Sequence, residues 1–230
     1  MLNWEVRPIE LKRSLGYAHR FRPSYAWANL GHPSIPCGRI CDANSLRTMT
    51  NLTERLAARI EVIPAAVEQE PILANLLELY AHDFSEFHDL EIGNDGRFGY
   101  EFLPLYWSDP DRYPFLVKAD GYLAGLILVK RGPGVFGNQV VWDMAEFFVL
   151  RGYRRRGIGT QMAHEIWRRF LGAWEVRVMQ SNVAANRFWA HSVSTFAGES
   201  VDPIFTEKGG ERWAVYTFSS SDVGNRVGLD

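Results

Sequence analysis

The sequence feature that most constrains this chain is the stretch YRRRGIGTQMA at residues 153–163, where three arginines run directly into a Gly-x-Gly pair. Apolar residues then recur at steps of three and four up to Leu171, which predicts an amphipathic helix with Gly172 as its C-terminal cap. A helix N-terminus carries unpaired N–H groups and a partial positive charge. Glycines let an anion approach the backbone, and arginines supply forked donors that suit phosphate. The stretch therefore predicts a pyrophosphate-binding loop, with a tight turn before a basic helix as the alternative.

Two common nucleotide-binding patterns do not match this loop. The Walker A pattern Gly-x4-Gly-Lys-Ser/Thr is absent from the chain, and Met162 stands where the dinucleotide fingerprint requires its third glycine. The Gly-x-Ser-x-Gly elbow of serine hydrolases is absent as well. The loop is therefore expected to hold a pyrophosphate of another kind.

The order of apolar patterns along the chain predicts one mixed α/β domain, of the α+β kind. Alternation and turn residues predict strands or hairpins near 59–64, 113–130, 138–150, 174–180 and 205–218, and helical spacing predicts a helix over 70–84. Asp120-Gly121 suits a two-residue type I′ turn between two apolar runs. We expect this domain at 49–218, with an irregular, basic extension at 1–48 and a frayed tail at 219–230.

Composition argues against several classes of protein. The net charge of −2 implies no nucleic-acid partner by itself, and no apolar run approaches the roughly 20 residues that a membrane helix needs. Cys37 and Cys41 cannot make a disulfide framework or a four-ligand zinc site, and we expect a cytoplasmic protein. His82 and His88 lie among carboxylates but lack a third fixed ligand, so we expect no metal. The sequence leaves open whether the chain forms a homodimer.

Three elements in order resemble the GNAT N-acetyltransferase superfamily. RRRGIG at 154–159 matches Arg/Gln-x-x-Gly-x-Gly/Ala, the acyl-coenzyme A loop of that family. MAEFFVL at 144–150 stands where the preceding strand belongs, and NVAANRFW at 182–189 is similar to Asn-x-x-Ala-x-x-Phe-Tyr. The resemblance implies a mixed, mostly antiparallel sheet flanked by helices, splayed between its fourth and fifth strands. It also implies acetyl-coenzyme A (acetyl-CoA) as co-substrate.

The resemblance further implies which residues contact acetyl-CoA. The pantetheine arm would lie in the splay, and the pyrophosphate on the backbone at the start of the helix. For Phe188, packing in the core is the alternative to a wall of the site. The implied contacts are Phe148, Val149, Leu150, Arg154, Arg155, Arg156, Gly157, Ile158, Gly159, Thr160, Asn182 and Phe188.

Acetyl transfer to an amine needs a base, because a lysine-like ammonium has a pKa of about 10.4. Glu146 is the candidate, since period two places it on the same face as Phe148 and Leu150. Apolar neighbours would raise the pKa of this carboxyl towards that of a useful base. A strand-end charge facing solvent is the alternative. Asp143 is the reserve, on the opposite face if the strand is regular.

The leaving thiolate has no obvious acid. Trp189 stands where relatives often have tyrosine, and an indole N–H cannot supply a proton at neutral pH. His191 and Tyr153 are other candidate donors, and a thiol pKa of about 8.5 makes the thiolate a tolerable leaving group. The family precedent places the oxyanion on a backbone N–H near Leu150.

An acidic, aromatic segment at the end of the first helix and in the loop after it would favour a cationic amine, with a solvated helix face as the alternative. Its carboxylates are Asp83, Glu86, Asp89, Glu91 and Asp95. We therefore expect an N-acetyltransferase that acts through a ternary complex on a primary amine, either a small molecule or a peptide. A non-catalytic acyl-CoA sensor is the alternative, motivated by the missing tyrosine. A nucleic-acid role for Arg154–Arg156 and the basic extension at 1–48 is disfavoured by the net acidic domain.

Overall fold

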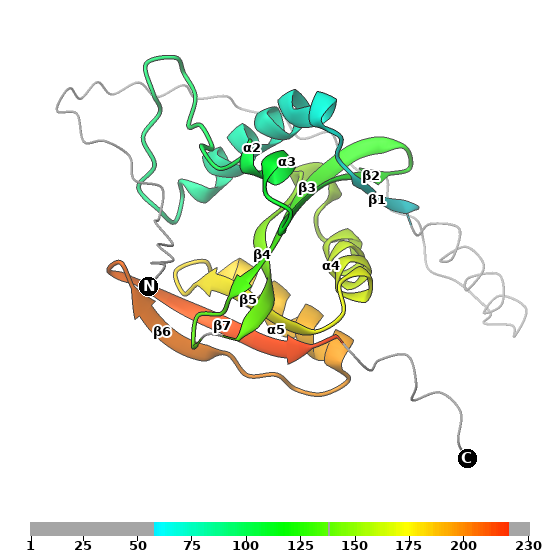
Figure 1. Ribbon diagram of the computed structural model, residues 1–230, viewed down its shortest axis with the longest axis vertical. Helices are drawn as coiled ribbons and strands as arrows, with labels where there is room; N and C mark the ends of the chain where they lie inside the picture. The colour runs from blue at the N-terminus through cyan, green and yellow to red at the C-terminus, as the bar shows by residue number, and fades with distance from the viewer. Residues whose placement is uncertain (1–57, 138, 221–230) are drawn as a thin grey trace, which may run out of the picture. The chain divides into compact units, whose positions relative to one another are not determined.

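The computed structural model describes residues 58–137 and 139–220, which form a seven-stranded sheet with helices on both faces (Figure 1). The strand order is β1-β2-β3-β4-β5-β7-β6, and every neighbouring pair is antiparallel except β4 and β5. The elements are β1 (Ile60–Pro64), η1 (Val67–Gln69), α2 (Glu70–Phe84), α3 (Leu105–Ser108), β2 (Arg112–Ala119), β3 (Tyr122–Pro133), β4 (Val140–Val149), η2 (Arg151–Tyr153), α4 (Ile158–Arg169), β5 (Ala173–Met179), α5 (Val183–Ala197), β6 (Ile204–Lys208) and β7 (Glu211–Ser219).

Strands β4 and β5 part soon after they meet. They pair through Trp142 with Trp174 and Asp143 with Glu175, and β4 then continues to Val149 without β5 beside it. The backbone edge of β4 that faces β5 is therefore open along its second half. The mixed, mostly antiparallel sheet and its splay between strands four and five are confirmed.

Two apolar layers enclose the sheet. Helix α2 packs with α3 on one face, where Leu73 and Leu77 belong to a buried cluster with Leu126, Leu128 and Phe148. Helices α4 and α5 cover the other face and share a larger buried cluster with β3 and β5. Figure 1 shows α2 and α4 on opposite sides of β3 and β4. The second half of β4 thus lies between the two layers.

A β-bulge in β4 changes which residues share a face. Leu128 of β3 pairs with Glu146, while the next residue, Val129, pairs with Met144, so Ala145 is the extra residue of the bulge. Asp143 pairs with Lys130 of β3, and Glu146 pairs with Leu128. Residues two apart on a strand point to the same face, and so do paired residues, so the two carboxylates face the same side of the sheet. The expectation that Asp143 lies on the opposite face was wrong, because the strand is not regular.

The predicted hairpin turn is confirmed at Asp120-Gly121. Both residues have positive φ, 52° and 83°, as a type I′ turn requires. The Asp120 carboxylate also accepts a hydrogen bond from the N–H of Arg59 at 2.9 Å, which ties the turn to the start of β1.

Helix α4 ends earlier than predicted. It stops at Arg169, because Phe170 takes an extended conformation and turns its ring towards Tyr113 and Trp142, at centroid distances of 4.9 and 4.7 Å. Gly172 is therefore not the helix cap, and Leu171 is 64% exposed instead of packing on the helix row. The packing of Phe170 against Tyr113 and Trp142 therefore ends the helix, although the apolar spacing continues to Leu171.

The described chain also extends beyond the predicted domain end. Ser219 belongs to β7, and the buried Ser220 donates its N–H to the carbonyl of Gly172 at 2.9 Å. The predicted tail therefore does not begin at Ser219. The extension at 1–48 lies outside the described residues, as do Cys37 and Cys41. Within 58–137 and 139–220, no helix combines the length and apolarity needed to cross a bilayer.

Candidate functional site

The glycine loop forms the N-terminus of α4. Gly157 occupies the N-cap with φ of 74°, a left-handed conformation that glycine adopts without strain. The first hydrogen bond of the helix runs from Gln161 N to Gly157 O at 3.1 Å, so the N–H groups of the three residues between them precede the helical ladder. Arg155, just before the cap, also has a positive φ of 61°. The loop therefore presents backbone donors at the positive end of a helix dipole.

Gly159 allows α4, α5 and β4 to approach one another closely. A Cβ at this position would lie 3.0 Å from Cε2 and 3.1 Å from Cζ of Phe188. The half-buried Phe188 ring in turn stacks on Phe147 of β4 at a centroid distance of 5.7 Å. Phe188 thus packs between elements of the core. Its predicted role as a wall of the cofactor site stays a prediction.

The open edge of β4 carries the backbone of Phe147 and Val149. Leu150 donates its N–H to the carbonyl of Ala124 at 2.8 Å, so its backbone faces β3. Backbone groups of successive strand residues point to alternate sides, and Phe148 therefore also faces β3. The predicted pairing of Phe148, Val149 and Leu150 with a pantetheine arm stays a prediction, and on this edge only the backbone of Phe147 and Val149 faces away from β3. The N–H of Leu150 is likewise already occupied, which argues against it as oxyanion donor.

Arg154 connects the loop to α2. Its Nε donates to the carbonyl of Val149 at 2.7 Å, its Nη2 pairs with Asp83, and its guanidinium carbon lies 5.6 Å from the centre of the Phe148 ring. Arg151 binds the same carboxylate with Nε at 3.0 Å and Nη2 at 2.6 Å. Burial alone would raise the pKa of Asp83, but hydrogen bonds from the two arginines outweigh it and hold that pKa below its usual value.

The other two arginines of the loop point elsewhere. Arg155 and Arg156 are exposed, and among the described residues neither makes an ion pair. The Arg156 guanidinium lies over the ring of Tyr153, 5.9 Å from its centre. These two side chains remain the predicted phosphate ligands.

Glu146 lies half-buried on β4 among tyrosines. The hydroxyl of Tyr100 donates to Oε1 of Glu146 at 3.0 Å. Burial raises the pKa of Glu146, while hydrogen bonding from Tyr80 and Tyr100 and the positive charge of Arg177 lower it in part. Burial and the Glu146 charge also raise the pKa values of Tyr80 and Tyr100, so both hydroxyls stay protonated donors. The structure therefore places the Glu146 carboxylate in a partly buried position beside tyrosine hydroxyls, and its role as the base stays a prediction.

Sequence reasoning missed these tyrosines. Helical spacing places Tyr80 only among the apolar positions of its helix, and α3, which carries Tyr106, was not predicted. The Tyr106 hydroxyl is buried and has no hydrogen-bond partner within the described part of the chain. Tyr100 is positioned by the preceding loop, where the Glu78 carboxylate accepts the N–H groups of residues 98 and 99 at 2.8 and 3.0 Å. Tyr80, Tyr100 and Tyr106 follow no regular spacing in the sequence, so no sequence pattern indicated that they would meet at Glu146.

An ion-pair group lies where β4 and β5 begin to diverge. Asp143 pairs with Arg177 of β5, with Nη2 to Oδ2 at 2.5 Å, and with Lys130 of β3 at 3.4 Å. The two cations come from the strands on either side of β4, so the carboxylate is occupied by contacts that join β3, β4 and β5. Asp143 is therefore better suited to bridging the strands than to the reserve role predicted for it.

Helix α5 begins with the predicted motif, but two of its residues have structural partners. Asn182 caps the helix, its Oδ1 accepting the N–H of Ala185 at 2.9 Å. Trp189 is only 7% exposed and packs against Phe147 and Trp167, at centroid distances of 4.8 and 6.1 Å. The position where relatives often carry tyrosine thus points into the core. The contact of Asn182 with a pantetheine arm stays a prediction.

The acidic segment at the end of α2 and in the loop after it divides into two parts. Asp83 is engaged by the arginines, whereas Glu86, Asp89, Glu91 and Asp95 are exposed. His88 connects this segment to β7 through the Glu211 carboxylate, with Nδ1 to Oε1 at 3.5 Å. The predicted acidic entrance therefore rests on the four exposed carboxylates.

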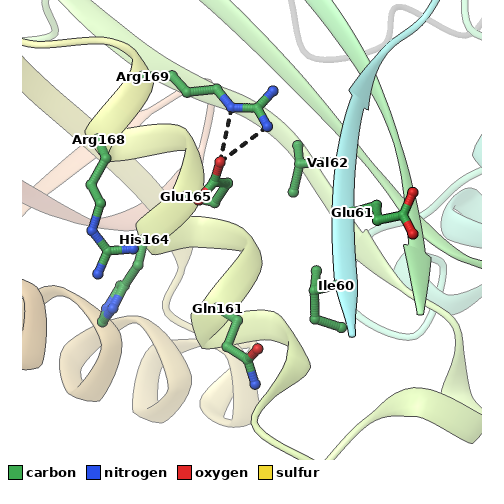
Figure 2. Close-up of a pocket in the computed structure, with 8 residues that line it drawn as sticks. All are labelled: Ile60, Glu61, Val62, Gln161, His164, Glu165, Arg168 and Arg169. Carbon is green, nitrogen blue, oxygen red and sulfur yellow. Dashed lines mark hydrogen bonds and ion pairs between the residues drawn. The ribbon is translucent and has the colours of Figure 1, made fainter. Parts of the chain in front are cut away.

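A separate polar cavity of about 470 Å³ lies between β1 and α4. Figure 2 shows Glu165 and Arg169 of α4 paired at its rim, opposite Ile60 and Val62 of β1. None of the predicted site residues lines this cavity. The site residues instead gather around the splay and the glycine loop.

Comparison with known proteins gives a family match and a fold match. Residues 73–192 match the family described as the acetyltransferase (GNAT) family. An acetyltransferase from Thermus thermophilus is 16% identical over 71% of this chain and 98% of its own, with a TM-score of 0.50. A GNAT family acetyltransferase from Streptococcus agalactiae is 13% identical over 70% of this chain and 95% of its own, with a TM-score of 0.55. No curated protein matches the sequence.

Proposed function

The chain belongs to the acetyltransferase (GNAT) family, and from this premise we propose that it transfers an acetyl group from acetyl-CoA to a primary amine. One observation carries the proposal. The half-buried Glu146, hydrogen-bonded to Tyr100, lies on the part of β4 that β5 has left, one short turn before the glycine loop. A candidate base therefore lies on the strand that leads into the candidate pyrophosphate cradle.

The residues around the splay fit acetyl-CoA. Gly157 leaves the N-terminus of α4 without a Cβ, and the exposed Arg155 and Arg156 directly precede it, so a diphosphate would find both backbone donors and positive charge. The open edge of β4 offers the backbone of Phe147 and the N–H of Val149 to an amide-containing arm, while the Val149 carbonyl accepts a hydrogen bond from Arg154. Bound acetyl-CoA would supply the reactive acetyl thioester.

Glu146 would take the proton that a primary ammonium must lose before it can attack. The raised pKa of this carboxyl brings it closer to the pH at which a base works best. The exposed carboxylates of the acidic segment would attract a cationic amine towards it. We propose direct attack in a ternary complex, on a small molecule or a peptide amine. A thiol with a pKa of about 8.5 can leave as thiolate without a dedicated acid, which is compatible with the burial of Trp189.

Calorimetric titration of the full chain with acetyl-CoA tests the proposal most directly. We expect micromolar binding, followed by release of free thiol when a panel of cationic amines is added. A folded protein that binds no acetyl-CoA would contradict the proposed function.

A non-catalytic acyl-CoA-binding module is the second candidate. The burial of Trp189, where relatives often have a tyrosine, favours it. The two candidates differ in turnover, because a sensor would bind acetyl-CoA but release no thiol with any amine in a broad panel.

Replacing Tyr100 by phenylalanine should move the pH dependence of the reaction. The Tyr100 hydroxyl stabilises the charged form of Glu146, so its loss raises the pKa of Glu146 further. Because the base must be deprotonated, the acidic limb of the plot of kcat/KM against pH should shift to higher pH in Tyr100→Phe. Tyr113→Phe, at an aromatic cluster with Phe170, is a matched control that should leave the limb in place. An unshifted limb in Tyr100→Phe would show that another group is the base.

A further inference from the structure

The Asp83 carboxylate is the meeting point of two arginines from the segment that joins β4 to the glycine loop. Asp83 lies one residue before the end of α2, and its side chain is 18% exposed. Arg151 binds Oδ1 through two nitrogens, and Arg154 binds Oδ2. Both oxygens of the carboxylate are therefore engaged by charge-assisted hydrogen bonds, which are stronger than neutral ones.

Arg154 is fixed by more than this carboxylate. Its Nε donates to the Val149 carbonyl, at the end of the open edge of β4, and its guanidinium lies over Phe148. A planar guanidinium held at three points has little freedom left, unlike a single exposed ion pair. The chain is thus tied at residue 154 to both α2 and β4.

The tie lies next to a strained part of the loop. Arg155 has φ of 61°, a left-handed conformation that is unfavourable for a residue with a Cβ. Such a conformation persists only where its surroundings determine it on both sides. The start of α4 at Gly157 supplies one side, and the tied Arg154 supplies the other.

From these contacts we infer that Asp83 is a positioning residue for acyl-CoA: it holds Arg154 in place and thereby keeps the glycine loop ready to receive the pyrophosphate. The inference rests on the proposed function, because it concerns the same loop. A loop that is already ordered loses less conformational entropy when a ligand binds. Because Asp83 would act through Arg154, it should influence the affinity for acyl-CoA more than the chemical step.

The positioning role and long-range electrostatics predict opposite effects of removing the Asp83 charge on the affinity for acyl-CoA. Removing a carboxylate beside a cationic loop would strengthen the binding of an anion if only long-range charge mattered. At about 0.15 M salt the Debye length is about 8 Å, so such a long-range gain is small. Loss of the ordered contacts should therefore dominate, and binding should weaken.

The test is calorimetric titration of Asp83→Asn, Arg154→Gln and the double variant with coenzyme A at about 0.15 M salt. We expect Asp83→Asn to raise Kd about tenfold, the size of effect that follows the loss of a hydrogen bond to a charged group. In steady-state kinetics the KM for acetyl-CoA should rise by a similar factor while kcat changes little. Asp83→Glu should recover part of the affinity.

The double variant shows whether Asp83 acts through Arg154. If it does, Asp83→Asn should have little further effect in the Arg154→Gln background. Asp111→Asn removes an exposed carboxylate just before β2 and should leave Kd unchanged, and thermal melting shows whether each variant is folded. Equal or tighter binding by folded Asp83→Asn, or fully additive effects, would overturn the inference. Absence of coenzyme A binding by the parent would instead contradict the proposed function.

Discussion

Glu146→Gln is expected to reduce turnover by at least about a hundredfold, the usual range for loss of a general base. The amide has nearly the same shape as the carboxylate, and its carbonyl oxygen can still accept the hydrogen bond from Tyr100. It cannot take a proton from an ammonium at neutral pH. Binding of coenzyme A should survive, since the carboxylate lies on the α2 side of the sheet and not in the loop.

The same variant should not be less stable than the parent. Burial raises the pKa of Glu146, which means that its charged form costs free energy at neutral pH. An uncharged amide avoids that cost, so the melting temperature at pH 7 should stay equal or rise. Glu199→Gln, at an exposed position after α5, is a control that should change neither turnover nor stability. A folded Glu146→Gln variant with parental turnover would remove Glu146 from the mechanism.

Gly157→Asp is expected to weaken acyl-CoA binding by at least about a hundredfold. Two unit charges about 4 Å apart repel by about 4 kcal/mol at an effective dielectric constant of about 20. A carboxylate at the N-cap of α4 would oppose a diphosphate at the same helix end and would also occupy its backbone donors. Calorimetric titration with acetyl-CoA measures the loss.

Gly157→Asn separates charge from backbone strain. Aspartate and asparagine both tolerate a left-handed conformation better than other residues with a Cβ, and their shapes are nearly equal. Asn should therefore reproduce the strain and the volume without the repulsion, and its affinity should fall about tenfold at most. Equal losses in the two variants would mean that the loop does not hold an anion at this point.

Local patterns predicted most of the elements, because their causes lie within a few residues. Helix α2 spans the predicted residues 70–84, and the Asp120-Gly121 turn has the backbone angles that its sequence requires. The glycine loop falls at the N-terminus of α4 for the same reason. The end of α4 was predicted wrongly, since the side chain of Phe170 is fixed by aromatic rings from β2 and β4.

The site was only partly predictable, because its details depend on contacts between distant parts of the chain. Asp83 and Arg154 are 71 positions apart, and no local pattern pairs them. Tyr100 reaches Glu146 across 46 positions. The bulge at Ala145 is a property of the register between β3 and β4, which the sequence of β4 alone does not reveal.

The bulge at Ala145 has a consequence for how β4 tolerates change in length. Residues before it and residues after it follow the two-residue alternation with opposite phase, which is why the bridging Asp143 and the candidate base Glu146 both face α2. Removing one residue there would move one of these carboxylates to the opposite face, where it would lie in the apolar layer under α4. The composition of the strand would remain almost unchanged. Whether both carboxylates lie on the α2 face depends on whether the number of residues between them is odd or even. A substitution in this strand leaves that number unchanged, whereas a single-residue insertion or deletion moves one carboxylate to the opposite face.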